Sequence, residues 1–474
     1  MPAKKLRKPQ TRQIRPKRPA ATWHTQVADL VTPKASPLSS LTLVYGFAGL
    51  ITLGTILLVL PVSSRTGQST FIIDALFTST SAVCVTGLAV LDTSSHWSSF
   101  GQGVIFFLIQ LGGFGFMTST TIFFLALRQR IGLRERLLVG ETMGVVAAGG
   151  MVKLVRKIAI FTLSVEGIGA IIFFFIFSPG NSTGTALWRA VFHSISAFNN
   201  AGFDILGNSF RSLIDYQQNT LLLLSTAALI ILGGISFIVL EDVIEARNLS
   251  KLRLDSKIVL ATTLALLILG TFFILGAESS NPDTLGGLTL PRKIVLSFFQ
   301  SVTSRTAGFS TIDIGKVADH TLAFIAFLMF IGGAAGSTAG GVKVGTFGIV
   351  ISAVVSSIRG KENGEAFGRT FLPEQILRAL TVIVLVLGMG AIVTLILIIT
   401  EDFNFIDILF EVFSALGTVG LSTGITPHLS LAGRVVLIPT MFIGRLGILT
   451  IVLSLVRHQQ TTTFCYPRGY VRIG

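Results

Sequence analysis

Long apolar runs alternate along this chain with short semi-polar segments, and the runs occur in pairs. Within each pair the two runs flank a semi-polar segment that is too short to cross a bilayer, which needs about 20 apolar residues. Such a segment must enter the membrane and return to the same side. The pairs of runs are 41–60 and 104–127, 158–177 and 221–240, 258–275 and 322–351, and 380–399 and 435–456.

The four semi-polar segments end in similar glycine motifs. They read FTSTSAVCVTGL at 77–88, SISAFNNAGF at 194–203, SVTSRTAGF at 301–309 and SALGTVGL at 414–421. Their glycines Gly87, Gly202, Gly308 and Gly420 are 115, 106 and 112 residues apart. Four similar units in one polypeptide predict an all-α membrane protein with eight transmembrane spans and four re-entrant pore helices around one pseudo-symmetric pore. The predicted repeats cover 39–127, 155–240, 256–351 and 374–456.

The glycine motifs are candidate ion filters. Glycine permits a backbone that turns carbonyl oxygens toward an axis, where they replace the water shell of a cation. Because no ring of Asp or Glu accompanies the glycines, the predicted ion is monovalent. The alternative is that these residues only assist helix packing. The candidate filter residues are Val85, Thr86, Gly87, Asn200, Ala201, Gly202, Thr306, Ala307, Gly308, Thr418, Val419 and Gly420.

Composition supports the membrane assignment. The 474-residue chain is 51% hydrophobic and 13% charged, and its mean hydropathy is +0.76. These values exclude an ordinary soluble protein. The cysteines Cys84 and Cys465 form no disulfide framework or metal-binding motif. No nucleophile–base pair or metal-ligand spacing is present, so we expect neither an enzyme nor a bound metal beyond a transported K+ or Na+.

The net charge of +14 is interpreted as a topology signal rather than as nucleic-acid binding. Residues 1–38 form a basic tail that we expect to be cytoplasmic and to touch anionic membrane lipid. Basic residues also gather between the units, so both termini, including the tail at 457–474, are predicted to be cytoplasmic. The inter-unit residues include Arg128, Arg130, Arg134, Arg136, Lys153, Arg156, Lys157, Arg247, Lys251, Arg253, Lys257, Arg359, Lys361, Arg369 and Arg378.

The third unit contains an unusual stretch, GGAAGSTAGGVKVG at 332–345, inside an apolar run. Each glycine costs a helix about 1 kcal/mol relative to alanine, so a broken helix is predicted here. The alternative is a close helix crossing through small residues. We expect a movable loop beneath the pore, with a gate formed by Gly336, Ser337, Thr338, Gly340, Gly341, Lys343 and Arg445.

Charged residues inside apolar runs suggest further roles. An intramembrane arginine is costly and usually functional, so Arg445 is expected to form an electrostatic barrier or to hold the gate loop. The alternative is a structural pair with a buried acid, of which Glu166 is the first candidate. Arg305 is expected to brace neighbouring loops. Asp74, Asp407, Glu411 and His193 are expected to be helix caps or structural polar contacts.

Together with GRLG at 444–447, the four glycine motifs and the stretch at 332–345 resemble the Trk/Ktr/HKT superfamily of cation transporters, and most of all the membrane subunits of bacterial Ktr systems. The resemblance implies potassium uptake through a gated pore in the cell membrane. It also implies a homodimer, a cytosolic KtrA-like nucleotide-binding regulatory ring, Na+ as a possible activator, and no cofactor in this chain. The stretch at 332–345 and Arg445 match the family's gate and its pore arginine.

Two alternatives remain within cation transport. One is a Na+/K+ symporter that alternates access to a site near the membrane midplane, and the other is a Na+-conducting member of the superfamily. Transporter repeats are commonly inverted, whereas the four units share one orientation, which favours the pore over the symporter.

Overall fold

A computed structural model describes residues 37–115, 151–206 and 212–448. Residues 1–36 of the predicted basic tail lie outside this part of the chain. So do the ends of the first and fourth predicted repeats, the basic residues Arg128, Arg130, Arg134 and Arg136, and the tail predicted at 457–474.

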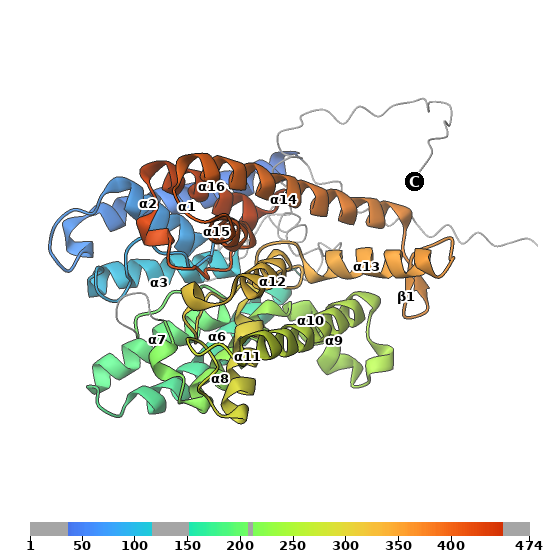
Figure 1. Ribbon diagram of the computed structural model, residues 1–474, viewed down its shortest axis with the longest axis horizontal. Coiled ribbons are helices and arrows are strands. Elements are labelled where there is room, and N and C mark those ends of the chain that lie inside the picture. The colour runs from blue at the N-terminus through green and yellow to red at the C-terminus, as the bar shows by residue number, and fades with distance from the viewer. Residues whose placement is uncertain (1–36, 116–150, 207–211, 449–474) are drawn as a thin grey trace, which may run out of the picture. The chain divides into compact units, whose positions relative to one another are not determined.

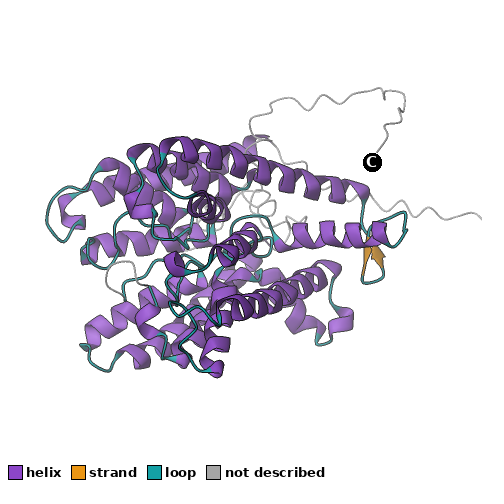
Figure 2. Ribbon diagram, viewed as in Figure 1, coloured by secondary structure: helices purple, strands orange, loops and turns teal. Residues whose placement is uncertain are grey.

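The described chain is almost entirely helical (Figure 2). Its α-helices are α1 Pro37–Val59, α2 Ile72–Val83, α3 Ser99–Phe114, α6 Met151–Phe177, α7 Thr183–Phe198, α8 Thr220–Gly234, α9 Phe237–Ala246, α10 Leu254–Glu278, α11 Leu290–Thr303, α12 Asp319–Phe330, α13 Val344–Ile358, α14 Pro373–Thr400, α15 Phe405–Gly417 and α16 Leu431–Leu446. Short 3-10 helices occupy Pro61–Ser63, Ile214–Tyr216, Leu249–Lys251, Ile314–Lys316 and Thr426–His428. Strands β1 Glu365–Ala366 and β2 Arg369–Thr370 pair antiparallel in a hairpin between α13 and α14 (Figure 1).

Four short helices, α2, α7, α11 and α15, lead into the predicted semi-polar segments and end within them. They contain 12, 16, 14 and 13 residues. At 1.5 Å per residue these helices are about 18–24 Å long, shorter than the roughly 30 Å hydrocarbon layer. Their C-terminal halves are buried almost completely. The short helices therefore lie at the centre of the hydrophobic core.

Each of the first three short helices packs against the long helix that precedes it through one repeated contact. A serine of the short helix donates a hydrogen bond to a carbonyl of the long helix, and a glycine three residues after that carbonyl leaves room for the serine. The bonds are Ser79 to Ile51 (2.8 Å) beside Gly54, Ser194 to Glu166 (2.6 Å) beside Gly169, and Ser301 to Leu267 (3.0 Å) beside Gly270. The sequence analysis missed this recurring serine–glycine contact.

The longest helices carry apolar side chains on their outward faces. In α10, Leu264 and Phe272 are 60% and 70% exposed, and in α14 Ile399 is 83% exposed. Exposed apolar faces of this extent fit contact with lipid. Three described helices are long and apolar enough to cross a membrane, or four if a bent pair counts as one span. The three are Val152–Phe177, Leu254–Glu278 and Pro373–Thr400. The eight predicted spans thus remain an expectation.

The run predicted as one span at 221–240 is bent. It forms α8 and α9, which meet at an angle of 94°. The last carbonyls of α8 are taken by another part of the chain: Gly233 accepts hydrogen bonds from the amide and hydroxyl of Thr338, and Gly234 accepts one from the Ala334 amide. Because those carbonyls are already satisfied by a segment lying across the end of α8, the helix does not continue straight.

The break predicted in the third unit is confirmed. The helix α12 ends at Phe330 and α13 begins at Val344, and residues 331–343 between them form an irregular loop. The other three helices in corresponding positions also end close to their glycines. Helix α3 ends before Gly115 and α16 before Gly447, whose φ angles are +75° and +83°. Positive φ values favour glycine and end a right-handed helix.

Candidate functional site

The four motif glycines meet in a closed ring. A Cβ atom added to Gly87 would lie 3.0 Å from the Cα of Gly202, and one added to Gly202 would lie 3.0 Å from the Cα of Gly308. A Cβ on Gly308 would lie 3.2 Å from the Cα of Gly420, and one on Gly420 would lie 3.0 Å from the Cα of Gly87. Segments separated by more than a hundred residues each are therefore in direct contact, in chain order around one centre.

Backbone carbonyl groups crowd this ring. The oxygen of the residue that precedes each glycine lies against the neighbouring glycine, so an added Cβ would collide with it. The distances from the added Cβ are 2.6 Å for Gly87 to Ala201, 3.0 Å for Gly202 to Ala307 and 2.6 Å for Gly308 to Val419, and the Gly420 Cβ would collide with Thr86. Real Cβ atoms essentially never lie closer than 3.0 Å to another atom, so a side chain at Gly87, Gly308 or Gly420 would force the backbone to move. At Gly202 a side chain would be tightly packed, and its positive φ of +69° also favours glycine.

The ring is held in an unusual backbone conformation. All four glycines have positive φ, and so does the residue two positions before each of them. These residues are Val85 (+56°), Asn200 (+58°), Thr306 (+74°) and Thr418 (+50°). Positive φ in a β-branched residue is a genuine outlier, and such strain concentrates at functional sites. Its recurrence in four separate loops indicates a conformation maintained for function rather than a local irregularity.

A hydroxyl group in each short helix braces the loop that follows it. In the first and fourth loops the hydroxyl accepts a hydrogen bond from the glycine N–H, and in the second and third it donates to the carbonyl after the glycine. The bonds are Gly87 to Ser81 (3.1 Å), Gly420 to Ser414 (3.1 Å), Ser196 to Phe203 (2.7 Å) and Thr303 to Phe309 (2.6 Å). These contacts hold the strained loops against rigid, buried helices.

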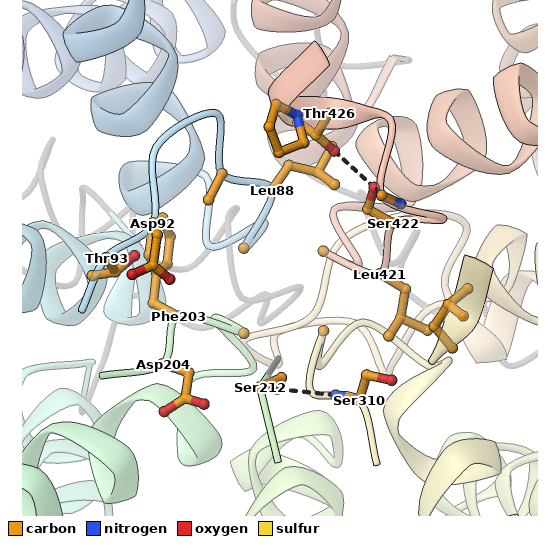
Figure 3. Close-up of a pocket in the computed structure, with 18 of the residues that line it drawn as sticks. Leu88, Asp92, Thr93, Phe203, Asp204, Ser212, Ser310, Leu421, Ser422 and Thr426 are labelled. Carbon is orange, nitrogen blue, oxygen red and sulfur yellow. Dashed lines mark hydrogen bonds between the residues drawn. The ribbon is translucent and has the colours of Figure 1, made fainter. Parts of the chain in front are cut away.

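On one side of the ring lies a cavity of about 300 Å³, lined by all four glycines and by the residues that follow them. Asp92 and Asp204 lie toward one side of it, and Ser422 and Thr426 toward another (Figure 3). Sequence reasoning missed this acidic lining. The available signal was the position of Asp204, which comes two residues after Gly202.

Asp204 is the acid most affected by the cavity. Its Oδ1 atom accepts a hydrogen bond of 2.7 Å from the Leu206 amide, while Oδ2 is buried without a partner among the described residues. The pKa of this carboxyl is raised to about 6, mainly by burial and also by the nearby charge of Asp92, while hydrogen bonding to the Leu206 amide and the charge of Arg189 oppose the rise. The charge near the ring therefore changes in the mildly acidic range.

The loop 331–343 lies at the other end of the ring. It contacts residues that precede the glycines, whereas the cavity is lined by residues that follow them. An added Cβ on Gly340 would collide with the Thr418 hydroxyl, and one on Gly332 would lie 3.3 Å from Cγ2 of Thr306. The loop therefore lies against the ring on the side opposite the cavity.

Six of the seven predicted gate residues belong to this loop, and the seventh, Arg445, lies in α16. Thr338 reaches farthest: its hydroxyl donates to the Gly233 carbonyl at 3.0 Å and contacts the Phe198 carbonyl at 3.4 Å. The hydroxyl of Ser337 and the ammonium of Lys343 bond within the loop, to the carbonyls of Ala334 (2.7 Å) and Ala339 (2.5 Å). Gly336 and Gly341 have φ angles of +73° and +64°.

Two guanidinium groups, of the buried Arg305 and the half-buried Arg445, attach this loop to its surroundings. Arg445 donates to the carbonyl of Thr338 and, at 2.5 Å, to that of Gly112 at the end of α3. Arg305 donates to the Gly332 carbonyl at 3.2 Å. The loop is thus tied to the first and fourth units through Arg445 and to the third filter motif through Arg305.

Arg445 and Glu166 do not pair with each other in the described part of the chain, so the suggested pairing is wrong. The Glu166 carboxylate accepts hydrogen bonds from the side-chain amides of Asn199 (2.9 Å) and Gln110 (3.1 Å), and the side-chain oxygen of Gln110 accepts one from Asn199 (3.0 Å). Amide donors satisfy the carboxylate, and backbone carbonyls satisfy the guanidinium. The carboxylate therefore joins α3 of the first unit to α6 and α7 of the second.

Removing this carboxylate is expected to destabilise the protein. Glu166→Ala leaves an N–H of the half-buried Gln110 amide without its acceptor and removes one of the acceptors of the Asn199 amide, which costs about 1–2 kcal/mol. We expect the purified protein to unfold at a lower temperature than the wild type, and Glu166→Gln, which keeps one acceptor oxygen, to fall between them. Glu374→Ala, at an exposed position in the first turn of α14, is the control. Equal unfolding temperatures for Glu166→Ala and the wild type would contradict a structural role.

The other charged residues make local contacts. Asp74 pairs with Arg434 at 2.6 Å, His193 bonds to Thr226 at 2.9 Å, and Asp407 accepts from Asn404 at 3.3 Å. These are the structural contacts that the sequence predicts. Glu411 bonds to Thr426. Among the described residues there is no cluster of three or more His, Cys, Asp or Glu side chains that could hold a metal ion.

Comparisons with known proteins agree with this geometry. The sequence profile of the TrkH family, described as "Cation transport protein", matches residues 19–465. The chain is 41% identical over 435 residues to the potassium/sodium uptake protein NtpJ of Enterococcus hirae, covering 90% of this chain and 96% of that protein. It is 41% identical over 432 residues to the Ktr system potassium uptake protein B of Bacillus subtilis, covering 91% and 96%.

A solved structure shares the fold. The crystal structure of the potassium transporter TrkH from Vibrio parahaemolyticus matches with a TM-score of 0.69 and 18% sequence identity, covering 90% of this chain and 86% of that one. At this identity the match concerns the fold alone.

Proposed function

This chain belongs to the TrkH family of cation transport proteins, and on that premise we propose that it is the gated, pore-forming subunit of a potassium uptake system. The observation that carries the proposal is the closed ring of Gly87, Gly202, Gly308 and Gly420, with a carbonyl oxygen crowded against each glycine. Carbonyl oxygens are neutral, hard donors suited to a monovalent cation. Relatives at 41% identity are named as potassium uptake proteins.

In this proposal the three residues ending at each ring glycine form the filter, and the cavity is its outer mouth. The short helices α2, α7, α11 and α15 end at the ring, so the partly negative C-terminal ends of their dipoles support a cation there. The loop 331–343 is the gate on the cytoplasmic side, held closed by Thr338 and Arg445. Eight spans, four re-entrant pore helices and cytoplasmic termini complete the arrangement.

The same proposal includes a homodimer, regulation by a cytosolic nucleotide-binding ring and Na+ as an activator. The word "system" in the name of one relative fits association with other subunits, and the potassium/sodium uptake named for another fits a role for Na+. The second candidate function is a Na+-conducting pore or a Na+/K+ symporter. NtpJ is named as a potassium/sodium uptake protein, and this name favours a role for Na+ as the alternative.

Uptake of labelled K+ and Na+ tests the proposal in a host that lacks its own potassium uptake systems. We expect saturable K+ uptake that exceeds Na+ uptake, and discrete single-channel current steps in a bilayer. Uptake of Na+ alone would favour the alternative pore. Strict stoichiometric coupling of Na+ to K+ without current steps would favour the symporter and contradict a pore.

External pH is expected to change uptake through Asp204. Above its pKa of about 6 the carboxylate is charged and attracts cations to the cavity, whereas below it the carboxyl is protonated and neutral. Lowering external pH from about 7.5 to about 5 should therefore raise the half-saturating K+ concentration about two- to fivefold, the effect of one partly screened charge. Labelled K+ uptake at subsaturating concentrations measures this.

In the Asp204→Asn variant the half-saturating K+ concentration should be raised at all pH values and should not change with external pH. Asp215→Asn is the control, because it neutralises an acid between the same two helices that does not line the cavity. A wild-type pH profile in Asp204→Asn would show that another group is responsible.

A further inference from the structure

Behind the wall of the cavity lies a buried carboxylate with incomplete contacts. Glu411, in the middle of α15, has no exposed surface, and its Oε2 atom has no hydrogen-bond partner among the described residues. No ion pair among those residues includes it. A buried carboxylate without a positive partner is costly. A bound cation or a proton is therefore needed to neutralise the Glu411 carboxylate.

Hydroxyl oxygens surround the carboxylate on the side that faces the cavity. Thr426 donates to Oε1 of Glu411, and the Ser422 hydroxyl lies beside that of Thr426. The hydroxyl oxygens of Thr426 and Ser422 are 2.9 Å apart, and both residues line the cavity (Figure 3). The three side chains form a cluster of oxygen atoms between the cavity and the core.

We propose that Glu411, Ser422 and Thr426 form a second binding site for an alkali-metal cation, separate from the glycine ring. The proposal rests on the proposed function only in that the cavity is open to transported ions. One carboxylate with neutral hydroxyl oxygens balances a single positive charge, whereas divalent ions need more carboxylates. Asp407, the nearby charged group, is also acidic, so it favours a cation.

A cation in this site would stabilise the fourth loop. Ser422 lies two residues after Gly420 of the ring and its hydroxyl accepts a hydrogen bond of 3.0 Å from the Gly424 amide. The bound ion would connect α15, which precedes Gly420, with the segment that follows it. The site thus positions Gly420 without itself being part of the conduction path.

Thermal unfolding of the purified full-length protein tests the site. The protein is kept in choline chloride, and NaCl or KCl replaces choline at constant ionic strength. We expect one of the two ions to raise the unfolding temperature in a saturable way. Glu411→Gln should raise the apparent Kd of that ion by at least about tenfold, equivalent to about 1.4 kcal/mol. The ion whose Kd changes identifies the occupant as Na+ or K+.

The matched control is Glu374→Gln, which removes an exposed acid in the first turn of α14, outside the site, and should leave the Kd unchanged. Ser422→Ala keeps the carboxylate and should raise the apparent Kd of the same ion about threefold or more. This variant tests the site if Glu411→Gln does not fold. Identical Kd values in the wild type and both site variants would overturn the proposal and leave a protonated Glu411. Loss of K+ uptake with an intact cation-dependent shift would instead reject the proposed function alone.

Discussion

Replacing Gly420 with serine is expected to raise the half-saturating K+ concentration at least about tenfold, because the change disturbs the ring in two ways. The φ angle at this position is +92°, and an added Cβ would collide with the Thr86 carbonyl and lie 3.0 Å from the Cα of Gly87. Relief of the collision must move a backbone carbonyl that we assign to ion coordination. Labelled K+ uptake over a range of concentrations gives the measurement.

Gly424 offers a matched control four residues away. Its φ is +99°, close to that of Gly420, but an added Cβ would meet no atom within 4 Å. Gly424→Ser therefore reproduces the backbone strain without the collision, and we expect its half-saturating K+ concentration to stay within about twofold of the wild type. If both variants were impaired equally, strain in the fourth loop would explain the result and the ring would not.

Shortening the loop 331–343 is expected to raise K+ flux at least about tenfold. Deletion of 336–341 removes Thr338, which makes hydrogen bonds to Gly233 and accepts one from Arg445. Each such bond contributes about 1 kcal/mol, so losing several shifts a closed–open equilibrium by more than a factor of ten. Flux is measured per inserted protein in liposomes. A flux that falls or stays unchanged would contradict the gate.

Two point variants separate the closing contact from the loop's own structure. Thr338→Val removes the hydroxyl that reaches Gly233 and Phe198 in the second unit, and it should raise flux about three- to fivefold. Ser337→Ala removes a neighbouring hydroxyl that bonds to Ala334 within the loop. It is expected to change flux by less than about twofold. Equal effects would indicate general loosening of the loop rather than loss of the closing contact.

The positions of the ring and of the break in the third unit were predictable from the sequence because they depend on backbone conformations that few residues adopt. Gly87, Gly202, Gly308 and Gly420 have positive φ and little or no room for a side chain. A glycine-rich stretch inside an apolar run opposes a continuous helix, and the chain leaves the helix between Phe330 and Val344. Such constraints act within one segment, so they limit which residue types can occupy it and can be recognised in the sequence.

Contacts between distant segments were less predictable. The sequence suggested Glu166 as a partner for Arg445, but the arginine binds the carbonyls of Thr338 and Gly112. Every residue has a carbonyl, so no residue type reveals which one is available to a guanidinium. The bend after Gly234 has the same origin, since it depends on a loop that begins almost a hundred residues later.

By itself, the sequence determined that the chain is a helical membrane protein, where its four glycine loops lie and where the third unit breaks, because apolar length and glycine content act within one segment. Only the tertiary structure decided which carbonyls Arg445 binds, that Asp92 and Asp204 share a cavity with the ring, and that Glu411 meets Ser422 and Thr426. Those arrangements depend on how separate segments pack. The spacing of two residues along the chain does not predict whether packing brings them into contact.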